Sequence, residues 1–335
     1  MTTLVTGAAG FIGYHVALRL LMRGEPVIGI DNLNAYYDPR LKEDRLAELR
    51  KFGGPGFSFK KVDFADDRAL EGALADLEFE RIVHLGAQAG VRHSIENPRA
   101  YVSSNIVGHL NMLEVARERR TAHLVYASSS SVYGGNGSLP FRVSDRVDRP
   151  VSLYAATKKA DELMSESYAH LYRIPMTGLR FFTVYGPWGR PDMAVWIFTQ
   201  RILLGEPIPV FNTGQMRRDF TYVDDIVSGV MASLDNPPPD DGQAKPGGSV
   251  APHRIYNVGN HRSEDLLLMI ELVEKACGKK AILEYLPMQP GDVSETYADI
   301  EPIRSDLGFS PSTILAEGIP RFVDWFRFYS GLRSD

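Results

Sequence analysis

A tyrosine and a lysine four residues apart, Tyr154 and Lys158, are the side chains of this 335-residue sequence best suited to chemistry. On a helix, side chains at this spacing share one face. A lysine ammonium beside a phenolate stabilises it, so the phenolate can accept a proton from a sugar or alcohol hydroxyl. Four serines, residues 128–131, precede the pair, and one of their hydroxyls could hold the substrate oxygen. The same spacing often arises by chance on an ordinary helix surface, so the rest of the chain must decide.

A glycine-rich turn near the start of the chain predicts a nucleotide site. The apolar run 3–6 predicts a strand, and the glycines of residues 7–13 open a helical pattern that ends near Gly24. A second strand, 27–30, ends at Asp31. Glycines let the backbone approach a pyrophosphate at a helix N-terminus, where free N–H groups favour anions. The spacing is Gly-x-x-Gly-x-x-Gly rather than the generic Gly-x-Gly-x-x-Gly, but strand, glycines, helix, strand and acid follow in order.

The acids and small residues at later strand ends point to the same cofactor. Asp31 lies 18 residues beyond Gly13, where a carboxylate accepts from a ribose 2′-hydroxyl and repels a 2′-phosphate, which favours NAD over NADP. Asp63 could reach the adenine amino group, and the strand 81–87 ends in small residues that could border the cofactor. The predicted cofactor-binding residues are Gly7, Ala9, Gly10, Phe11, Ile12, Gly13, Asp31, Asn32, Asp63, Phe64, Leu85, Ala87, Tyr154 and Lys158.

Composition excludes several classes of function. The chain is 44% apolar and 24% charged, with a net charge of −5 and no basic patch, which argues against a nucleic-acid partner. Cys277 is its only cysteine, so a disulfide framework and a cysteine-based metal site are both excluded, and we predict no metal. His84 and His123 fall in apolar strands and are expected in the core. A strand that begins at residue 3, and no apolar run near the ~20 residues of a membrane span, predict a cytoplasmic protein without membrane contact.

The order of elements predicts an α/β fold. Strands alternate with helices through about residue 180, which indicates a Rossmann-like doubly wound parallel sheet. Beyond that point prolines interrupt the pattern, and the stretch 236–249 is typical of an exposed loop. We therefore predict an NAD-binding domain over residues 1–180, to which some later segments return. Residues 181–335 would mainly form a smaller C-terminal α/β lobe that binds the substrate.

The strand end that carries the serines, together with Tyr154 and Lys158, resembles the extended short-chain dehydrogenases/reductases that act on nucleotide sugars. This is the NAD-dependent epimerase/dehydratase family. The resemblance covers essentially the whole chain and also rests on segments 6–13, 31–32, 128–134 and 180–183 and on Asp63. It implies that the tyrosine is the base and that the lysine binds the nicotinamide ribose. It further implies a Ser or Thr against the sugar 4-hydroxyl, a role that counting back from Val132-Tyr133-Gly134 puts on Ser129.

The residues after Ser129 discriminate among the reactions of this family. Similar 4,6-dehydratases carry an Asp-Glu pair there, and decarboxylating relatives usually carry a glutamate. This chain has Ser130 and Ser131, and a serine hydroxyl is not a general acid near neutral pH. The sequence therefore favours hydride transfer out and back at one carbon, which is epimerisation.

Four further segments resemble the UDP-glucuronate 4-epimerases: residues 31–40, 88–94, 184–193 and 288–292. A uronate needs a positive or hydroxyl-rich pocket, which Arg190 with Thr183 and Ser130 or Ser131 could supply. A solvated loop arginine is an equal alternative for Arg190. The predicted substrate-binding residues are Ser129, Ser130, Ser131, Arg92, Thr183, Arg190, Val210, Phe211, Arg218 and Asp292.

The resemblance also assigns the UDP end of the substrate. It implies that Arg218 contacts the phosphates, that Phe211 in the strand with Val210 borders the uracil, and that Asp292 binds the uridine ribose. Galactose-type epimerases bring an arginine to the diphosphate where this chain has Gln289, so a phosphate role there is in doubt.

Three alternatives stay open at this point. The chain could be a 4-epimerase of neutral UDP-hexoses such as glucose and galactose, a UDP-glucuronate decarboxylase, or a non-catalytic NAD-binding protein. The last class typically loses the tyrosine or the lysine, and both are present. The family commonly pairs through two helices, here the one after Asn105 (with Leu110, Leu113 and Val115) and the one that carries Tyr154, so we expect a homodimer.

Overall fold

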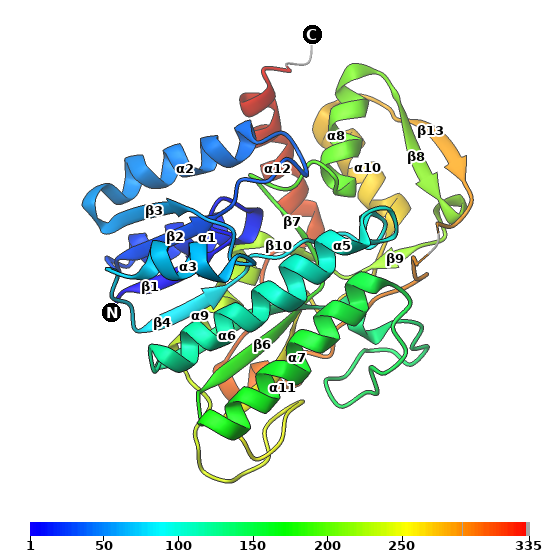
Figure 1. The fold of residues 1–335 in the computed structure, drawn as a ribbon. Coiled ribbons are helices and arrows are strands. Elements are labelled where there is room, and N and C mark those ends of the chain that lie inside the picture. Colours follow the sequence, from blue (N-terminus) through cyan, green and yellow to red (C-terminus); the bar gives the residue numbers. More distant parts are fainter. Residues whose placement is uncertain (290, 333–335) are drawn as a thin grey trace.

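A seven-stranded parallel sheet forms the centre of the protein (Figure 1). The computed structural model describes residues 1–289 and 291–332, so Pro290 of the segment 288–292 and the last three residues of the 181–335 unit lie outside the described residues. The strand order is β11-β6-β5-β4-β1-β2-β3, which reverses direction between β1 and β4 and confirms the predicted doubly wound sheet. Its strands are β1 (Thr3–Thr6), β2 (Val27–Asp31), β3 (Phe57–Lys61), β4 (Arg81–His84), β5 (His123–Ser129), β6 (Met176–Phe181) and β11 (His253–Val258).

Helices cover both faces of this sheet and bury its apolar strands. One core joins the sheet to α1 (Phe11–Met22), α2 (Arg40–Gly53) and α9 (Val223–Asp235). A second core joins the opposite face to α3 (Asp67–Leu74), α6 (Gly108–Glu118) and α7 (Leu153–Tyr172). The short helices α4 (His93–Glu96) and α5 (Pro98–Tyr101) and a π-helical turn, Val102–Val107, lead into α6. A sheet covered on both faces explains why every residue of β1, β2 and β4 is buried, without alternation between buried and exposed positions.

Helix α7 begins where its sequence provides a cap. The Ser152 hydroxyl accepts a hydrogen bond from the backbone N–H of Ala155 at 3.1 Å, which satisfies one free donor of the first turn. The helix ends at Arg173, whose backbone is left-handed. A defined start fixes the rotation of the helix, and with it the direction in which the residues of its first two turns point.

A smaller lobe with its own core lies over the carboxyl ends of the sheet strands. In Figure 1 its helices α8 and α10 and the pair β8–β13 lie to one side of the sheet. The pair β7–β10 packs against α9, and the pair β9–β12 lies beside α10. Its elements are β7 (Thr183–Tyr185), α8 (Ala194–Leu204), β8 (Pro207–Phe211), a turn at Asn212–Gly214, β9 (Arg217–Arg218), β10 (Phe220–Tyr222), β12 (Glu264–Asp265), α10 (Leu266–Cys277), β13 (Ile282–Leu286) and α12 (Leu315–Ser330).

Three segments from the second half of the chain return to the sheet, the third being α11 (Glu301–Leu307), which packs against β11. Strand β11 pairs with β6 at its edge, and α9 packs against α1. The division at residue 180, which allows for such returns, stays a proposal. Within the described residues, none of the helices has the length and apolar character needed to cross a membrane.

Candidate active site

The glycine turn between β1 and α1 is too tight for side chains. A Cβ atom on Gly13 would lie 2.0 Å from the carbonyl oxygen of Gly7, and one on Gly10 would lie 2.9 Å from the same oxygen. Gly7 itself has a φ of +66°, a conformation that glycine adopts without strain. The turn therefore presents bare backbone at the N-terminus of α1, which fits a pyrophosphate.

Asp31 stands at the end of β2 with a cation beside it. Its Oδ1 accepts from the backbone N–H of Leu33 at 2.8 Å and lies 3.4 Å from the buried Nζ of Lys42. That ammonium also donates to Asn34 at 3.0 Å. Asp31 is therefore held in one orientation at the rim of the cavity, as a ribose-binding carboxylate would need to be. The residues present fit a dinucleotide.

Tyr154 and Lys158 lie in the first two turns of α7, above the end of β5. The Nζ of Lys158 donates to the carbonyl oxygen of Ala127 at 3.1 Å and to Oδ2 of Asp161 at 3.0 Å. An ammonium has three N–H groups, so one remains for a ligand. The Tyr154 hydroxyl forms no hydrogen bond with the residues that the structure describes, and it borders the cavity.

A buried polar network lies beneath this pair. The carboxylate of Glu162 accepts from both sides of the Arg180 guanidinium, at 2.7 and 2.8 Å, and from the Ser128 hydroxyl at 2.7 Å. Burial alone would raise the pKa of Glu162, but Arg180 holds this pKa below its ordinary value. Asp161 is different, because burial raises its pKa to about 7 despite the neighbouring Lys158. Ser128 is therefore committed to the network and is not available to hold a substrate.

The next three serines face the open cavity. The Ser129 oxygen accepts from the backbone N–H of Ser131 at 3.2 Å, which leaves its own O–H free to donate. Ser129 borders both the cofactor side and the substrate side, whereas Ser130 and Ser131 border only the substrate side. The Ser131 hydroxyl is buried without a partner among the described residues. The position of Ser129 at both cavities agrees with its assignment, rather than that of Ser128, to the sugar hydroxyl.

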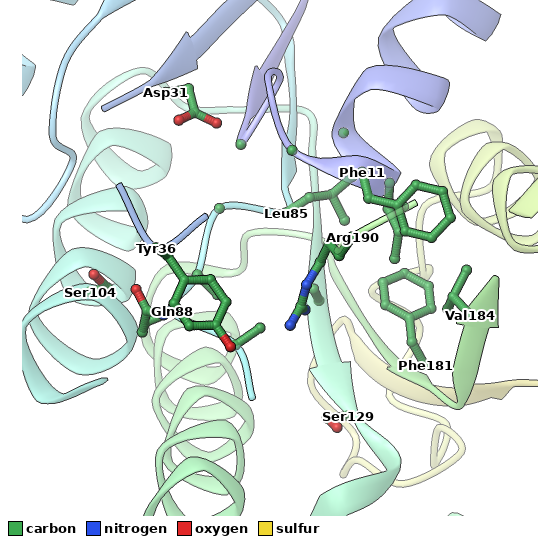
Figure 2. Close-up of a pocket in the computed structure, with 18 of the residues that line it drawn as sticks. Phe11, Asp31, Tyr36, Leu85, Gln88, Ser104, Ser129, Phe181, Val184 and Arg190 are labelled. Atoms are coloured by element: carbon green, nitrogen blue, oxygen red, sulfur yellow. The ribbon is translucent and has the colours of Figure 1, made fainter. Parts of the chain in front are cut away.

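Two connected cavities run along the carboxyl edge of the sheet. The first, of about 230 Å³, is bordered by the glycine turn and by Asp31; the second, of about 750 Å³, lies under the smaller lobe. Figure 2 shows Asp31 at one end of the first cavity and Ser129 toward the other, with apolar side chains along one wall. The residues that border both cavities are Tyr36, Ala89, Ser129, Tyr154, Phe181, Phe182, Arg190 and Met193. A cofactor and a substrate would therefore meet beside Tyr154.

Arg190 is one of these shared residues, and its side chain is only 22% exposed. Its Nε donates to Oδ1 of Asp192 at 3.0 Å, and its Nη2 donates to the other carboxylate oxygen. The Tyr36 hydroxyl donates to the same carboxylate at 3.0 Å. Burial opposes the charge of Arg190, but the ion pair with Asp192 raises its pKa above the ordinary value. Arg190 is thus a charged residue of the cavity wall and not a solvated loop arginine.

The far end of the second cavity is lined by two more arginines. Arg92 donates to Asp292 at 2.9 Å, and its guanidinium lies 4.4 Å from the centre of the Phe211 ring. Arg218 donates to the carbonyl oxygen of Ser294 at 3.1 Å, and burial lowers its pKa. Cations beside an aromatic ring and a carboxylate could bind a diphosphate next to a base and its ribose.

Three predicted residues do not line either cavity within the described part of the chain: Ala9, Asp63 and Val210. Ala9 is fully buried, and its carbonyl oxygen accepts from Arg45 at 2.9 Å. Asp63 lies beside the first cavity, where it accepts from the Asn32 side chain at 3.0 Å. Val210 is fully buried in the core of the smaller lobe. Side chains alternate along a strand, so Phe211 faces the cavity and the Val210 side chain faces the core. A substrate contact at Val210 stays a prediction.

Every other predicted residue borders a cavity. The cofactor side includes Gly7, Gly10, Phe11, Ile12, Gly13, Asp31, Asn32, Phe64, Leu85, Ala87, Tyr154 and Lys158, and the substrate side includes Ser129, Ser130, Ser131, Arg92, Thr183, Arg190, Phe211, Arg218 and Asp292. Gln289, whose phosphate role was in doubt, does not border the second cavity.

Several cavity residues were not predicted from the sequence. Tyr36 and Asp192 belong to segments that carried the family resemblance, and Lys42 lies two residues beyond one of them, but the resemblance did not reveal which side chains point inward. Gln88 and Ser104 also border the first cavity. For Lys42 a local signal existed, because a lysine in the apolar face of α2, eleven residues from Asp31, is a candidate partner for that acid.

The histidines of the strands are core residues, as expected. His84 bonds the Thr6 hydroxyl at 2.7 Å, and His123 bonds the Thr177 hydroxyl at 3.0 Å. Burial lowers the pKa of each to about 3. Among the described residues, no three His, Cys, Asp or Glu side chains are grouped to hold a metal ion.

Residues 3–259 match the model of the NAD dependent epimerase/dehydratase family, and the chain belongs to this family. A probable UDP-glucuronate 4-epimerase from Rhizobium meliloti is 48% identical over 97% of this chain and 97% of its own. UDP-glucuronate 4-epimerase 1 of Arabidopsis thaliana is 45% identical over 100% of this chain and 78% of its own. Among solved structures, UDP-glucuronic acid 4-epimerase from Bacillus cereus, in complex with UDP-glucuronic acid and NAD, has a TM-score of 0.88 at 32% identity and covers 98% of this chain and 100% of its own.

Proposed function

We propose that this protein is a UDP-glucuronate 4-epimerase, which interconverts UDP-glucuronate and UDP-galacturonate through a 4-keto intermediate. The observation that carries the proposal is the junction of the two cavities, where Tyr154, Ser129 and Arg190 all border the same space. A base, a hydroxyl donor and a cation at one point suit the C4 hydroxyl and the C6 carboxylate of a hexuronate. The relatives described above carry the same activity in their names.

NAD, when bound in the first cavity, supplies the chemistry of taking up a hydride and returning it at C4 of the sugar. The glycine turn would hold its pyrophosphate, and Asp31 would hold the adenosine ribose. The free N–H of Lys158 would hold the nicotinamide ribose. All three groups border the first cavity.

Tyr154, as phenolate, accepts the proton of the C4 hydroxyl, and Ser129 donates a hydrogen bond to the same oxygen. The ammonium of Lys158, held by Ala127 and Asp161, favours the phenolate electrostatically. After the hydride has left C4, the keto sugar turns about its diphosphate and presents the other face. When the hydride returns to C4 from that face, Tyr154 returns the proton to the same C4 oxygen, so the protein ends the cycle as it began.

The UDP moiety is the fixed point of this rotation. Arg92 and Arg218 would bind its phosphates, Phe211 would border the uracil, and Asp292 would bind the uridine ribose. These groups lie in the second cavity under the smaller lobe, away from the glycine turn. Holding one end of the substrate lets the sugar turn without dissociating.

The C6 carboxylate of the substrate must be restrained, because a 4-keto uronate is a β-keto acid and loses CO2 readily. Arg190, Thr183, Ser130 and Ser131 would bind it. Asp192 is the carboxyl group nearest to Arg190, and although burial disfavours its charge, Arg190 holds its pKa below the ordinary value. Asp192 is therefore ionised near neutral pH and has no proton to donate for dehydration or decarboxylation.

Incubation of the purified protein with UDP-glucuronate, followed by separation of the products, tests the proposal. UDP-galacturonate is expected as the product. A UDP-pentose with CO2 as the main product would indicate a decarboxylase. Equal activity on UDP-glucose, unaffected by Arg190→Ala, would indicate an epimerase of neutral hexoses.

We also propose a cytoplasmic homodimer that pairs through α6 and α7. Leu110, Leu163 and Leu171 on these helices are 39%, 60% and 63% exposed, which supports a contact there, whereas Leu113 is buried in the protein's own core. Light scattering after size exclusion tests this: a mass of twice the 37.3 kDa chain is expected, and a monomer at micromolar concentration would contradict it.

A further inference from the structure

The loop that carries Arg190 is tied down by side chains from the nucleotide half of the chain. Arg45 of α2 donates to the carbonyl oxygens of Trp188 and Gly189 at 2.6 and 3.1 Å, and a ring nitrogen of His15 lies 2.8 Å from the carbonyl oxygen of Pro187. Arg45 is fully buried. The backbone of the loop is thus fixed up to Gly189, and only the side chain of Arg190 needs a further restraint.

That restraint comes from Tyr36 and Asp192. The Asp192 carboxylate accepts hydrogen bonds from Nε–H and from one Nη2–H of Arg190, and the Tyr36 hydroxyl donates to the same carboxylate at 3.0 Å. Tyr36 reaches across from the loop after β2, 156 residues away in the sequence. Figure 2 shows the Tyr36 ring and the Arg190 guanidinium pointing into the same space. The guanidinium also lies 5.8 Å from the centre of that ring.

Among the residues that the structure describes, this arrangement leaves one edge of Arg190 without a partner. A guanidinium has five N–H groups, and Asp192 accepts from two of them, on the Nε side. The remaining edge, formed by Nη1 and the second Nη2 hydrogen, has the forked shape that matches a planar carboxylate. Since Arg190 borders both cavities, the orientation of this edge decides whether a sugar carboxylate meets two donors or none.

We propose that Tyr36 and Asp192 are positioning residues that aim the free edge of Arg190 at the substrate carboxylate, and that they thereby set both the preference for uronates and the retention of the carboxylate. This inference rests on the proposed function. In the 4-keto sugar, CO2 leaves when the C5–C6 bond lies parallel to the π orbital of the C4 carbonyl group. The electron pair of that bond then enters an enolate between C4 and C5, and water supplies the proton that C5 takes up. A carboxylate held by both of its oxygens on an aimed guanidinium is kept from that alignment.

If Asp192 acted only through its charge, removing that charge would lower KM for UDP-glucuronate, whereas a positioning role predicts that KM rises. Its negative charge near the substrate carboxylate would repel it, so removing the charge would tighten binding. Positioning predicts that the same change weakens binding, because Arg190 then adopts several rotamers and the cost of ordering it falls on the substrate. The direction of the change in KM therefore separates the two roles.

The experiment compares the full-length wild type with Asp192→Asn and Tyr36→Phe. For Asp192→Asn we expect KM for UDP-glucuronate to rise about tenfold, the size of one lost charge-assisted hydrogen bond. The share of UDP-pentose or its keto precursor among the products should rise as well. Activity on any neutral UDP-sugar that the wild type accepts should stay within about twofold of its wild-type value, a readout that general damage to the fold would not spare. Tyr36→Phe should also raise KM for UDP-glucuronate and the share of UDP-pentose, by a smaller factor.

The chain contains a matched control in Asp148→Asn. Arg146 and Asp148 form the same Arg-x-Asp pair on an exposed loop, with side chains 84% and 52% exposed and away from both cavities. This variant should leave KM and the product ratio unchanged. An unchanged or lower KM and an unchanged product ratio in both test variants would overturn the inference while leaving the proposed function in place. A wild type that does not convert UDP-glucuronate would overturn both.

Discussion

Two cations of the site, Lys158 and Arg190, are held in different ways. The Lys158 side chain is 4% exposed and lies on a long helix, with one bond to the backbone of the adjacent strand and one to a residue three positions along the same helix. Arg190 lies on a loop, is 22% exposed, and depends on Asp192 and on Tyr36 from the other half of the chain. The group that assists proton transfer is built into regular elements, whereas the group that selects the substrate is built from loops.

This difference has a functional consequence. Proton transfer at C4 is common to every nucleotide sugar that the family could epimerise, so it needs a constant geometry. Recognition of a carboxylate distinguishes one substrate from another, and loops can change without disturbing the sheet. Changes on the Lys158 side should therefore affect all substrates alike, and changes on the Arg190 side should affect uronates alone.

The largest effect is expected for Tyr154→Phe. The substitution removes the proton acceptor and keeps the ring, so kcat should fall by roughly 10²- to 10⁴-fold, the usual contribution of a general base. The loss should be the same for UDP-glucuronate and for any neutral sugar that the wild type accepts. Steady-state rates with both substrates measure it, and a variant that epimerises at the wild-type rate would contradict the role of Tyr154.

Glu162→Gln tests the network beneath Lys158. It leaves the buried Arg180 without its carboxylate, and breaking such a pair costs about 3–5 kcal/mol. We expect this loss in the free energy of unfolding, measured with urea. Glu118→Gln is the control, because its pair with Arg117 is exposed and is worth about 0–1 kcal/mol. An equal loss of unfolding free energy in the two variants would show that the buried network stabilises the protein no more than an exposed ion pair does.

Arg190→Ala should act on one class of substrate only. Loss of a charge-assisted contact to the carboxylate should lower kcat/KM for UDP-glucuronate by roughly 10- to 100-fold. The value for UDP-glucose should change little, which would sharpen the contrast with Tyr154→Phe. Parallel losses on both substrates would place Arg190 with the general machinery instead of with specificity.

The smallest effect is expected for Asp161→Asn, in the pH dependence of stability. Burial raises the pKa of Asp161 from 3.8 to about 7, so the folded protein keeps a proton that the unfolded chain releases. The stability linked to this proton is complete below about pH 4 and is lost as the pH rises through about 7. Because asparagine does not ionise, Tm of the variant relative to the wild type should rise between pH 5 and pH 8.

Asp148→Asn serves as the control for this titration, since its exposed carboxylate has a lowered pKa and does not titrate between pH 5 and pH 8. The thermal unfolding of all three proteins should be followed in the same buffers. Curves of Tm against pH that run parallel for Asp161→Asn and the wild type would contradict a protonated Asp161.

The positions of Tyr154, Lys158 and Asp31 could be predicted from the sequence better than the surroundings of Arg190, for a physical reason. Tyr154 and Lys158 share a helix face, and Asp31 ends a strand, so local rules place all three. Val210 and Phe211 were both predicted, but the Val210 side chain lies in the core and only Phe211 borders the cavity, because side chains alternate along β8 and only the fold reveals which face is which. Tyr36 meets Asp192 across 156 residues. No local rule predicts such a contact, and the sequence alone left Arg190 equally well explained as a solvated residue.

Conversion of UDP-glucuronate labelled with deuterium at C4 tests the central claim most directly. Removal and return of the hydride within one site predict UDP-galacturonate that retains the deuterium at C4, without release of CO2. The products can be resolved by NMR of the sugar protons. A UDP-pentose as the main product, or a UDP-galacturonate that has exchanged its deuterium with solvent, would contradict it.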